Sequence, residues 1–472
     1  MATATAHCTC SSRAAWRRPQ RRVVLCLAQQ QQQGVHVIGA GAAGLTAAYF
    51  AAVSGAQVTV LEKNAEAGKK ILISGGTRCN VLPAEVDLQR DFVTESSRSA
   101  LRAVFSSWSL DDCSFWLSDP HQIGIKLELE RETGKLFPAS NSAAEVRDRL
   151  VQACRQQGVE FVYGAGLQDL EQQPGGSWLL RLDDGSTMPA QQVILATGGL
   201  SFPKLGATGD GFRLLRRRGH SLHEPYPALT PLLGIHPGGE QLAGISLYSV
   251  ELAAVAAADG GSSSGKKKKS RARSRVQRTA MLFTHRGFSG PAVLDLSHLS
   301  VRALDRQQPP PQILVQWTGK GAAEWEATLL EGGSLLVVNL LRKEGVPQRL
   351  AEALCGEAGV PLDRKLSELK KTERAGLLAA LTKYVLPVTG SEGYAKAEVT
   401  GGGIPLNELS ASSMESRILP GVFVCGELCD VFGRIGGFNF LWAWVSGRLA
   451  GLAAAEAAAA GGTQQPAAEH AA

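Results

Sequence analysis

Three glycines near the start of the chain have the spacing of a turn that binds phosphate. They stand in the sequence GAGAAG, which has the GxGxxG pattern. The first glycine of such a turn allows a tight bend, the second lets the backbone approach a pyrophosphate, and the third lets a helix pack on a strand. The N–H groups at the start of that helix then face the phosphates. The predicted dinucleotide-binding turn is Gly39, Ala40, Gly41, Ala42, Ala43 and Gly44.

An acidic residue follows this turn at the separation that a dinucleotide site requires. Glu62 ends the apolar run VTVLE, which is the next predicted strand after the helix. A carboxylate in this position accepts hydrogen bonds from ribose hydroxyls and repels a 2′-phosphate. The site is therefore not expected to prefer NADP, whereas NAD and FAD both stay open. A glycine-rich turn that binds nothing is the structural alternative, and the complete strand, turn, helix, strand and acid context disfavours it.

A second candidate segment, GKKILISGGTRCN, comes soon after Glu62. Its glycine pair stands between an apolar run and a polar cluster, which suggests that the backbone lies close to a ligand. Arg78 could pair with a phosphate or with a local carboxylate, and a plain surface turn is the alternative. The cofactor contacts predicted here are Lys63, Lys70, Gly75, Gly76, Arg78, Cys79 and Asn80.

Two later segments end apolar strands with small residues. VILATGG, from Val193 to Gly199, is the first, and ligands of open α/β sheets bind at the carboxyl ends of strands. A plain exit from the sheet is the alternative here. GVFVCGELCDVFGRIGGFNF is the second, and a helix that starts near Gly437 would aim free N–H groups at whatever lies before it. The first segment adds the predicted contacts Ala196, Thr197 and Gly198.

Together these segments resemble a known family. In order along the chain, they and the segments FPASNSAAEV, ATGGLSFPKLGATGDGF and MLFTHRGFSGPAVLDLS are similar to the BaiN/YhiN-type NAD(P)/FAD-dependent oxidoreductases. The likeness covers about Val35 to Ala455 and extends more distantly to the flavoprotein subunits of fumarate reductase and succinate dehydrogenase. It implies that the C-terminal segment closes over the flavin end of FAD. The contacts implied there are Gly426, Glu427, Gly436, Gly437, Asn439 and Phe440.

The resemblance also implies an activity. We expect an FAD-dependent oxidoreductase that passes hydride from flavin N5 to an activated C=C bond of a small molecule, such as an enone. A helix N-terminus beside the flavin would stabilise the negative charge of its reduced form. A cation or acid near the substrate would stabilise enolate charge and deliver a proton. Arg434 and His285 are the candidates for this catalytic role, although a structural role is the more common one for such residues.

The electron donor and two competing functions stay open at this point. The chain has no second GxGxxG for a separate nucleotide domain, so NADH or NADPH could bind transiently at the flavin face, or a protein carrier could serve. One alternative is an NAD-dependent dehydrogenase, which would hold no flavin. The other is a non-catalytic FAD-binding protein whose basic loop contacts RNA or an acidic membrane surface. We assign no metal ligands, and the oligomeric state is left open.

The elements that position these residues begin as a β-α-β unit. VHVI predicts a buried strand, Ala42 to Ser54 a helix, and QVTVLE a second strand. Further strands are expected at EFVYG, SWLLRLDDGS and QQVILATGG. From about Arg216, the segments PALTPLL, LYSVELAAVA, TAMLFTHRGFSGPAVLDLS and QILVQW also suggest strands, and mainly helical segments follow to about Thr389. A final helix is expected from Asn439 to about Ala455, with Trp442 and Trp444 in the core.

The predicted fold class is therefore α/β, with a Rossmann-like FAD-binding domain formed by both chain ends and an inserted β-rich plus helical domain. The expected division is a leader at 1–33, the FAD-binding domain at 34–215 and 391–457, a β-rich insertion at 216–335 with a disordered basic loop at 259–275, a helical insertion at 336–390, and a disordered tail at 458–472.

Positive charge is concentrated outside the expected folded body. Arginines are frequent in the predicted leader, and a run of lysines and arginines lies between Lys266 and Arg275. Without these two groups, the basic residues of the chain no longer outnumber the acidic ones, so the remainder is mildly acidic. We therefore expect no specific nucleic-acid partner for the folded body. No apolar run is long enough to predict a transmembrane segment.

The predicted leader at 1–33 resembles an organelle transit peptide. It contains Ala, Ser, Thr and Arg, and the first acidic residue of the chain is Glu62. We expect a chloroplast location, with the mitochondrion and a leader without an address as the alternatives. The cysteines are odd in number and scattered, which indicates a reducing compartment. Cys425 and Cys429 are expected to be small buried residues at a strand end and not a redox pair.

Overall fold

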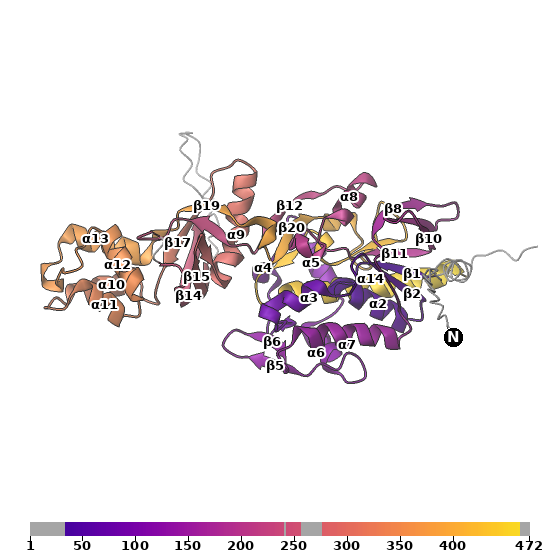
Figure 1. Cartoon of the computed structure of the whole chain (residues 1–472), viewed down its shortest axis with the longest axis horizontal. Coiled ribbons are helices and arrows are strands. Elements are labelled where there is room, and N and C mark those ends of the chain that lie inside the picture. The colour runs from indigo at the N-terminus through magenta and orange to yellow at the C-terminus, as the bar shows by residue number, and fades with distance from the viewer. Residues whose placement is uncertain (1–33, 240–241, 256–275, 463–472) are drawn as a thin grey trace, which may run out of the picture.

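A parallel sheet made from both ends of the chain forms the centre of the fold. The computed structural model describes residues 34–239, 242–255 and 276–462. Its five-stranded sheet has the order β21-β11-β1-β2-β7, and every neighbouring pair is parallel (Figure 1). The strands are β1 (Val35–Ile38), β2 (Val58–Glu62), β7 (Glu160–Tyr163), β11 (Gln192–Leu195) and β21 (Val422–Val424). The predicted Rossmann-like class, with a strand from the C-terminal part, is confirmed.

Two helices from opposite ends of the chain pack against each other beside this sheet (Figure 1). They are α2 (Ala42–Val53) and α14 (Phe438–Gly462). The contact depends on glycines, because a Cβ at Gly447 would lie 2.5 Å from the carbonyl oxygen of Ala43. A Cβ at Gly451 would lie 2.3 Å from the carbonyl oxygen of Ala47. Helix α14 therefore joins the C-terminal part of the chain to the first β-α-β unit.

Helix α14 is longer than the sequence predicted. It continues to Gly462, whereas a disordered tail was expected from residue 458. Alanine has the highest helix propensity, and Ala454, Ala455 and Ala458 are buried against the core. The rest of the expected tail, the leader and the basic loop lie outside the described residues.

Smaller elements surround the parallel sheet. They include a three-stranded antiparallel sheet, β3-β6-β5, whose strand β3 packs against α14. The remaining elements of this part are β3 (Leu82–Pro83), α3 (Lys69–Ile73), α4 (Leu88–Asp91), β4 (Phe92–Val93), α5 (Arg98–Phe105), α6 (Leu110–Ser118), β5 (Leu127–Glu130), β6 (Lys135–Pro138), α7 (Ala143–Gln156), β8 (Leu167–Gln172), β9 (Trp178–Leu182), β10 (Thr187–Ala190), α8 (Asp210–Arg217) and β22 (Phe432–Gly433).

A second, antiparallel sheet forms the inserted part of the chain. Its order is β18-β17-β14-β15-β16-β13-β19, and the pair β12-β20 lies between it and the parallel sheet (Figure 1). The strands are β12 (His223–Ala228), β13 (Leu232–Gly234), β14 (Ser246–Val255), β15 (Val276–Thr284), β16 (Gly287–Ser289), β17 (Gln312–Gln316), β18 (Tyr384–Val385), β19 (Val388–Ser391) and β20 (Val399–Gly403).

One predicted strand of this part is a helix. The segment PAVLDLS was expected to be extended, but it begins α9 (Pro291–Asp305). Proline is favourable in the first turn of a helix, where its missing N–H has no partner in any case. Gly290 before it has a φ of 89°, which lets the chain turn sharply from β16 into the helix.

The helices at the far end of the inserted part form a small bundle (Figure 1). They are α10 (Ala322–Leu330), α11 (Val337–Lys343), α12 (Gln348–Glu357) and α13 (Lys371–Thr382). Their core is continuous with that of the antiparallel sheet and separate from the core of the parallel sheet. Within the three described ranges, no helix is both long and apolar enough to cross a membrane.

Candidate functional site

A cavity of about 550 Å³ lies at the carboxyl ends of the parallel strands. Strands β1, β2 and β11 each end at it, and the C-terminal loop between β21 and α14 closes one side. The lining therefore combines residues from both ends of the chain, as the predicted two-ended site requires. It includes Gly39, Glu62, Ala196, Thr197, Gly198, Gly426, Glu427, Gly436, Gly437, Asn439 and Phe440.

The first glycine turn has little free space on one side and much on the other. Gly39 has a φ of 104°, and a Cβ there would lie 2.5 Å from the carbonyl oxygen of Ala196. A Cβ at Gly44 would lie 1.9 Å from the carbonyl oxygen of Gly39, so only glycine lets α2 begin this close to the turn. Gly41 has no atom within 4 Å of its Cβ position among the described residues. A ligand can therefore approach the backbone at Gly41.

Two helix N-termini face the cavity. Gly41 caps α2 without a side-chain hydrogen bond, and the first turn of α2 contains no acidic residue. The first turn of α14 contains no acidic residue either, and Asn439 and Phe440 from that turn line the cavity. The N–H groups at the start of a helix have no partner within the helix, and they carry the positive end of its dipole. Both ends of the cavity therefore favour negative charge.

These features fit FAD, because the two helix N-termini would stabilise the negative charge of a bound cofactor. The hydroxyl of Thr197 is buried in the cavity wall and has no hydrogen-bond partner in the described part of the chain. The amide of Asn439 is occupied, since it both accepts from the N–H of Gly433 (2.8 Å) and donates to its carbonyl oxygen (2.9 Å). Asn439 therefore fixes the loop before α14 and leaves its backbone free for a ligand.

Glu62 is held at the cavity by its neighbours. Its Oε2 accepts a hydrogen bond from the N–H of Ala40 (2.8 Å), and its Oε1 accepts from the N–H of Asn64 (2.8 Å). The Asn64 side chain donates to the same oxygen (2.7 Å). The carboxylate thus lies next to the glycine turn, where a ribose would have to bind.

The three predicted cationic contacts all line the cavity, and each has an acidic protein partner. Lys63 pairs with Asp210 (2.9 Å), and Lys70 pairs with Glu427 (2.8 Å). Arg78 pairs with Glu130 (3.0 Å), and its guanidinium lies 4.0 Å from the centre of the Phe137 ring. The sequence could not reveal these pairs, because their partners are distant along the chain. The other predicted contacts of this segment that line the cavity are Gly75, Gly76 and Asn80.

Cys79 was predicted as a cofactor contact, and the structure does not support this. Its side chain is buried in the apolar core, and it is absent from the described lining of the cavity. Burial raises the pKa of its thiol to about 12, so it stays protonated. The backbone at Cys79 has a φ of 59°, which marks a sharp turn of the chain at this point. Gly44 likewise does not line the cavity, and its role is to pack α2.

Neither predicted catalytic residue lies in the cavity. Among the described residues that line it, Arg434 and His285 are both missing. The guanidinium of Arg434 is bound to the carboxylate of Asp91 (2.7 Å) and lies 4.3 Å from the centre of the Phe438 ring. His285 is exposed in the turn between β15 and β16. The structure therefore places both residues outside the described lining of this cavity, and a catalytic role for either stays a prediction.

The cysteines and tryptophans of the C-terminal segment belong to the core, as expected. Cys425 and Cys429 are buried free thiols, and burial raises the pKa of Cys425 to about 12. Trp442 and Trp444 are buried, and their indole N–H groups donate to the carbonyl oxygens of Gly426 (2.9 Å) and Val81 (3.0 Å).

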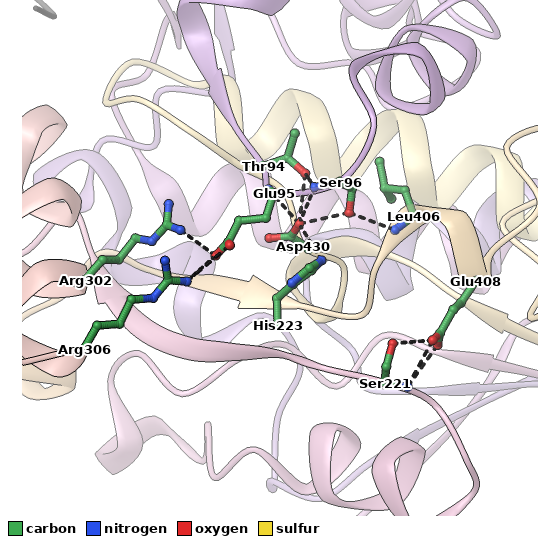
Figure 2. A network of polar contacts seen from close by, with 10 residues as sticks. All are labelled: Thr94, Glu95, Ser96, Ser221, His223, Arg302, Arg306, Leu406, Glu408 and Asp430. Atoms are coloured by element: carbon green, nitrogen blue, oxygen red, sulfur yellow. Dashed lines mark hydrogen bonds and ion pairs between the residues drawn. The ribbon is translucent and has the colours of Figure 1, made fainter. Parts of the chain in front are cut away.

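Asp430 fixes this segment to distant parts of the chain (Figure 2). Its Oδ2 accepts hydrogen bonds from the Thr94 hydroxyl (3.0 Å) and from the N–H groups of Glu95 and Ser96 (2.9 Å each). Burial raises the pKa of Asp430, and these hydrogen bonds oppose that shift. Glu95 in turn pairs with Arg302 of α9 (2.7 Å). The loop after β21 is therefore tied to the inserted domain.

A second carboxylate, Asp295 of α9, contacts the same loop. Its Oδ1 accepts a hydrogen bond from the N–H of Ile435 (2.7 Å), which lines the cavity. Burial raises the pKa of Asp295 to about 7, and the hydrogen bond from Ile435 partly opposes this. The folded protein therefore binds this proton more tightly than the unfolded chain does. As a result, the free energy of unfolding falls as the pH rises from the unfolded-state pKa of the carboxyl group to its folded-state pKa.

We expect Asp295→Asn to remove this pH dependence. The asparagine oxygen can still accept from Ile435, but no proton has to leave the buried site. Between about pH 5 and pH 7, the wild-type protein should lose roughly 1.4 kcal/mol of stability per pH unit relative to the variant. Urea unfolding at several pH values measures this difference. Asp305→Asn, at the exposed end of the same helix, is the control and should follow the wild type. Parallel curves for Asp295→Asn and the wild type would contradict the prediction.

The fold and the cavity define the class of this protein as a Rossmann-type, FAD-binding oxidoreductase. Residues 33–453 match the family described as the HI0933-like protein Rossmann domain, so the chain belongs to that family. The resemblance predicted from the motifs is thereby confirmed.

Three known proteins illustrate the similarity. The ribosomal RNA dihydrouridine synthase of Escherichia coli K12 is 32% identical over 424 residues, which is 87% of this chain and 95% of the relative. The 3-dehydro-bile acid delta(4,6)-reductase of Clostridium scindens is 30% identical over 430 residues, which is 89% of this chain and 99% of the relative. A flavocytochrome c3 fumarate reductase structure in its open conformation aligns with a TM-score of 0.45 at 16% identity, covering 95% of this chain and 83% of the other.

Proposed function

We propose that this protein is an FAD-dependent reductase of a C=C bond conjugated to a carbonyl group. The observation that carries the proposal is one cavity that receives two helix N-termini, one from each end of the chain. Such a cavity suits an anionic dinucleotide, because each of the two helix N-termini can stabilise negative charge on it.

The names of two relatives point to the same bond chemistry. Dihydrouridine is uridine whose C5–C6 double bond is reduced, and that bond is conjugated to a carbonyl of the base. The name 3-dehydro-bile acid delta(4,6)-reductase likewise describes reduction of double bonds conjugated to a ketone. Reduction of an enone-type C=C bond is therefore what both names share, and we propose it for this chain.

The residues that would hold the cofactor follow from the cavity. The backbone at Gly41 and the first turn of α2 would bind the pyrophosphate, and Glu62 would accept hydrogen bonds from the ribose. The first turn of α14 would lie beside the pyrimidine end of the ring and favour its reduced, anionic form. When bound, FAD supplies hydride to an electron-poor carbon.

We propose a uridine of ribosomal RNA as the first acceptor to test. The similarity to the Escherichia coli synthase spans nearly its whole length, and the basic segment Lys266–Arg275 could add affinity for RNA phosphates. This departs from the expectation of a small-molecule substrate without a nucleic-acid partner. A small enone is the second candidate, which the similarity to the bile acid reductase favours. We propose NADH or NADPH as the electron donor.

Anaerobic turnover tests this function directly. The protein reduced by NADH or NADPH is mixed with ribosomal RNA, free uridine or 2-cyclohexen-1-one, and flavin reoxidation is followed by absorbance. We expect one acceptor class to reoxidise the flavin, with loss of its C=C bond detected by mass spectrometry. A flavin that no acceptor reoxidises would favour the non-catalytic alternative, and a protein without flavin would favour an NAD-dependent dehydrogenase.

We also propose that the leader at 1–33 directs the protein to the chloroplast. Fusion of this segment to a fluorescent protein tests the address. Fluorescence in mitochondria or in the cytosol would contradict it.

A further inference from the structure

Lys135 lines the cavity, and no pattern in the sequence indicated it. It is the first residue of β6, and its backbone lies opposite Glu130 of β5 and Pro83 of β3 in the antiparallel sheet. Its side chain reaches the loop before α14, because a Cβ at Gly436 would lie 3.7 Å from its Cε. Lys135 therefore lies at the end of the cavity next to α14, not at the end next to α2.

Lys135 differs from the other cations of the cavity in having no partner. Lys63, Lys70 and Arg78 each form an ion pair with an acidic side chain, and Lys69 donates to the side chain of Asn64 (3.3 Å). Within the described residues, the ammonium of Lys135 makes no hydrogen bond or ion pair. An unpaired cation that burial partly removes from water is costly, so it is expected to meet an anionic or strongly polar group of a ligand.

The surroundings of Lys135 suit a proton donor. Burial lowers the pKa of its ammonium, and the carboxylates of Glu130 and Asp295 oppose this effect. Among the described residues, neither carboxylate forms an ion pair with Lys135, and each has another partner. Glu130 is bound to Arg78 and Thr133, and Asp295 accepts from the N–H of Ile435. Because its pKa is lowered, the ammonium releases its proton more readily than an exposed lysine does.

We propose that Lys135 is the catalytic cation that binds the carbonyl oxygen of the acceptor and protonates its α-carbon. This inference rests on the proposed function and adds the residue that acts on the acceptor. Unlike Arg434 and His285, Lys135 is part of the described lining of the cavity.

When bound, reduced FAD would supply a hydride to the β-carbon of the acceptor, and the two electrons of the hydride would form the new C–H bond. The C=C π pair moves toward the carbonyl, whose developing negative charge the Lys135 ammonium stabilises. A proton from Lys135 then forms the second C–H bond, at the α-carbon, and the amine regains a proton from water. The electron donor restores reduced FAD.

Three variants of the full-length chain test this role. Lys135→Met removes the positive charge. Lys135→Arg keeps a positive charge, but the guanidinium does not release its proton. Lys126→Met is the control, because it changes an exposed lysine just before β5. For each we would measure FAD content, the rate at which 2-cyclohexen-1-one or uridine reoxidises the dithionite-reduced protein, and the flavin absorbance change when the oxidised protein is titrated with the same compounds.

We expect all three variants to hold FAD as the wild type does. Lys135→Met should lose acceptor binding and reoxidise roughly 10²-fold to 10⁴-fold more slowly. Lys135→Arg should recover binding, seen as a near-normal absorbance change in the titration, while its reoxidation rate stays low. Loss of FAD from Lys135→Met, or an unchanged reoxidation rate, would overturn the proposal.

The two proposals fail in different ways. A wild-type protein that holds FAD but transfers no electrons to any acceptor would contradict the proposed function. In that case, the titration of the oxidised protein with the acceptor compounds still tests the role of Lys135. Equal absorbance changes in the wild type and in Lys135→Met would overturn that role. Normal wild-type turnover with an unaffected Lys135→Met would overturn only the assignment of Lys135.

Discussion

Gly44→Ala should leave the protein with only a small fraction of the FAD that the wild type holds. The new Cβ would lie 1.9 Å from the carbonyl oxygen of Gly39 and 3.3 Å from the Cβ of Ala196. Because the closer contact is with backbone, α2 must move away from the turn that would bind the pyrophosphate. Overpacking of this kind costs about 1–3 kcal/mol, and a loss of about 1.4 kcal/mol in binding is tenfold in affinity.

Gly356→Ala is the matched control for this prediction. It is also a helical glycine, in α12, but no described atom lies within 4 Å of its Cβ position. It should keep its FAD and gain a little stability, because alanine restricts the unfolded chain more than glycine does. The absorbance ratio of flavin to protein after purification measures the outcome. Full FAD content in Gly44→Ala would show that the turn does not hold the cofactor.

Gly447→Leu should lower both the melting temperature and the FAD content. Its Cβ would meet the carbonyl oxygen of Ala43 at 2.5 Å and Cβ of Thr46 at 3.2 Å, so α14 must separate from α2. A loss of about 2–3 kcal/mol corresponds to a decrease in Tm of roughly 2–4 °C for a chain of this length. The N-terminus of α14 lines the cavity, so its displacement also disturbs the proposed flavin end.

Two further variants keep this second prediction testable. Gly447→Ala makes the same contact with a smaller side chain and can be measured if the leucine variant does not fold. Gly356→Leu introduces an equal side chain where there is space, and should melt as the wild type does. A Gly447→Leu protein with an unchanged Tm would contradict the close contact between the two ends of the chain.

The parts of the fold that the sequence predicted well are those with local patterns. The unit β1-α2-β2 follows from two apolar strands, a glycine turn and a terminal Glu62, and the structure contains all of these. Helix α9 was missed because the apolar run in PAVLDLS is short, and a run of this length can belong to a strand or to a helix. The decisive signals were Gly290, whose φ is positive, and Pro291 in the first helical turn.

The side-chain roles in the site were harder to predict because they depend on distant partners. Arg434 appeared to be available for chemistry until the structure placed Asp91, from the N-terminal part of the chain, against its guanidinium. Lys135 carried no signal, since a lysine at the start of a short strand is usually a solvated surface residue. Only the folded cavity shows that, among the described residues, it lacks a partner while its neighbours are paired.

Identification of the bound chromophore tests the central claim most directly. The full-length chain is purified, its visible spectrum is recorded, and the chromophore is released by heat and identified by chromatography. The two-ended cavity predicts FAD at an equimolar ratio to the chain. A colourless protein that cannot be reconstituted with FAD would contradict the account.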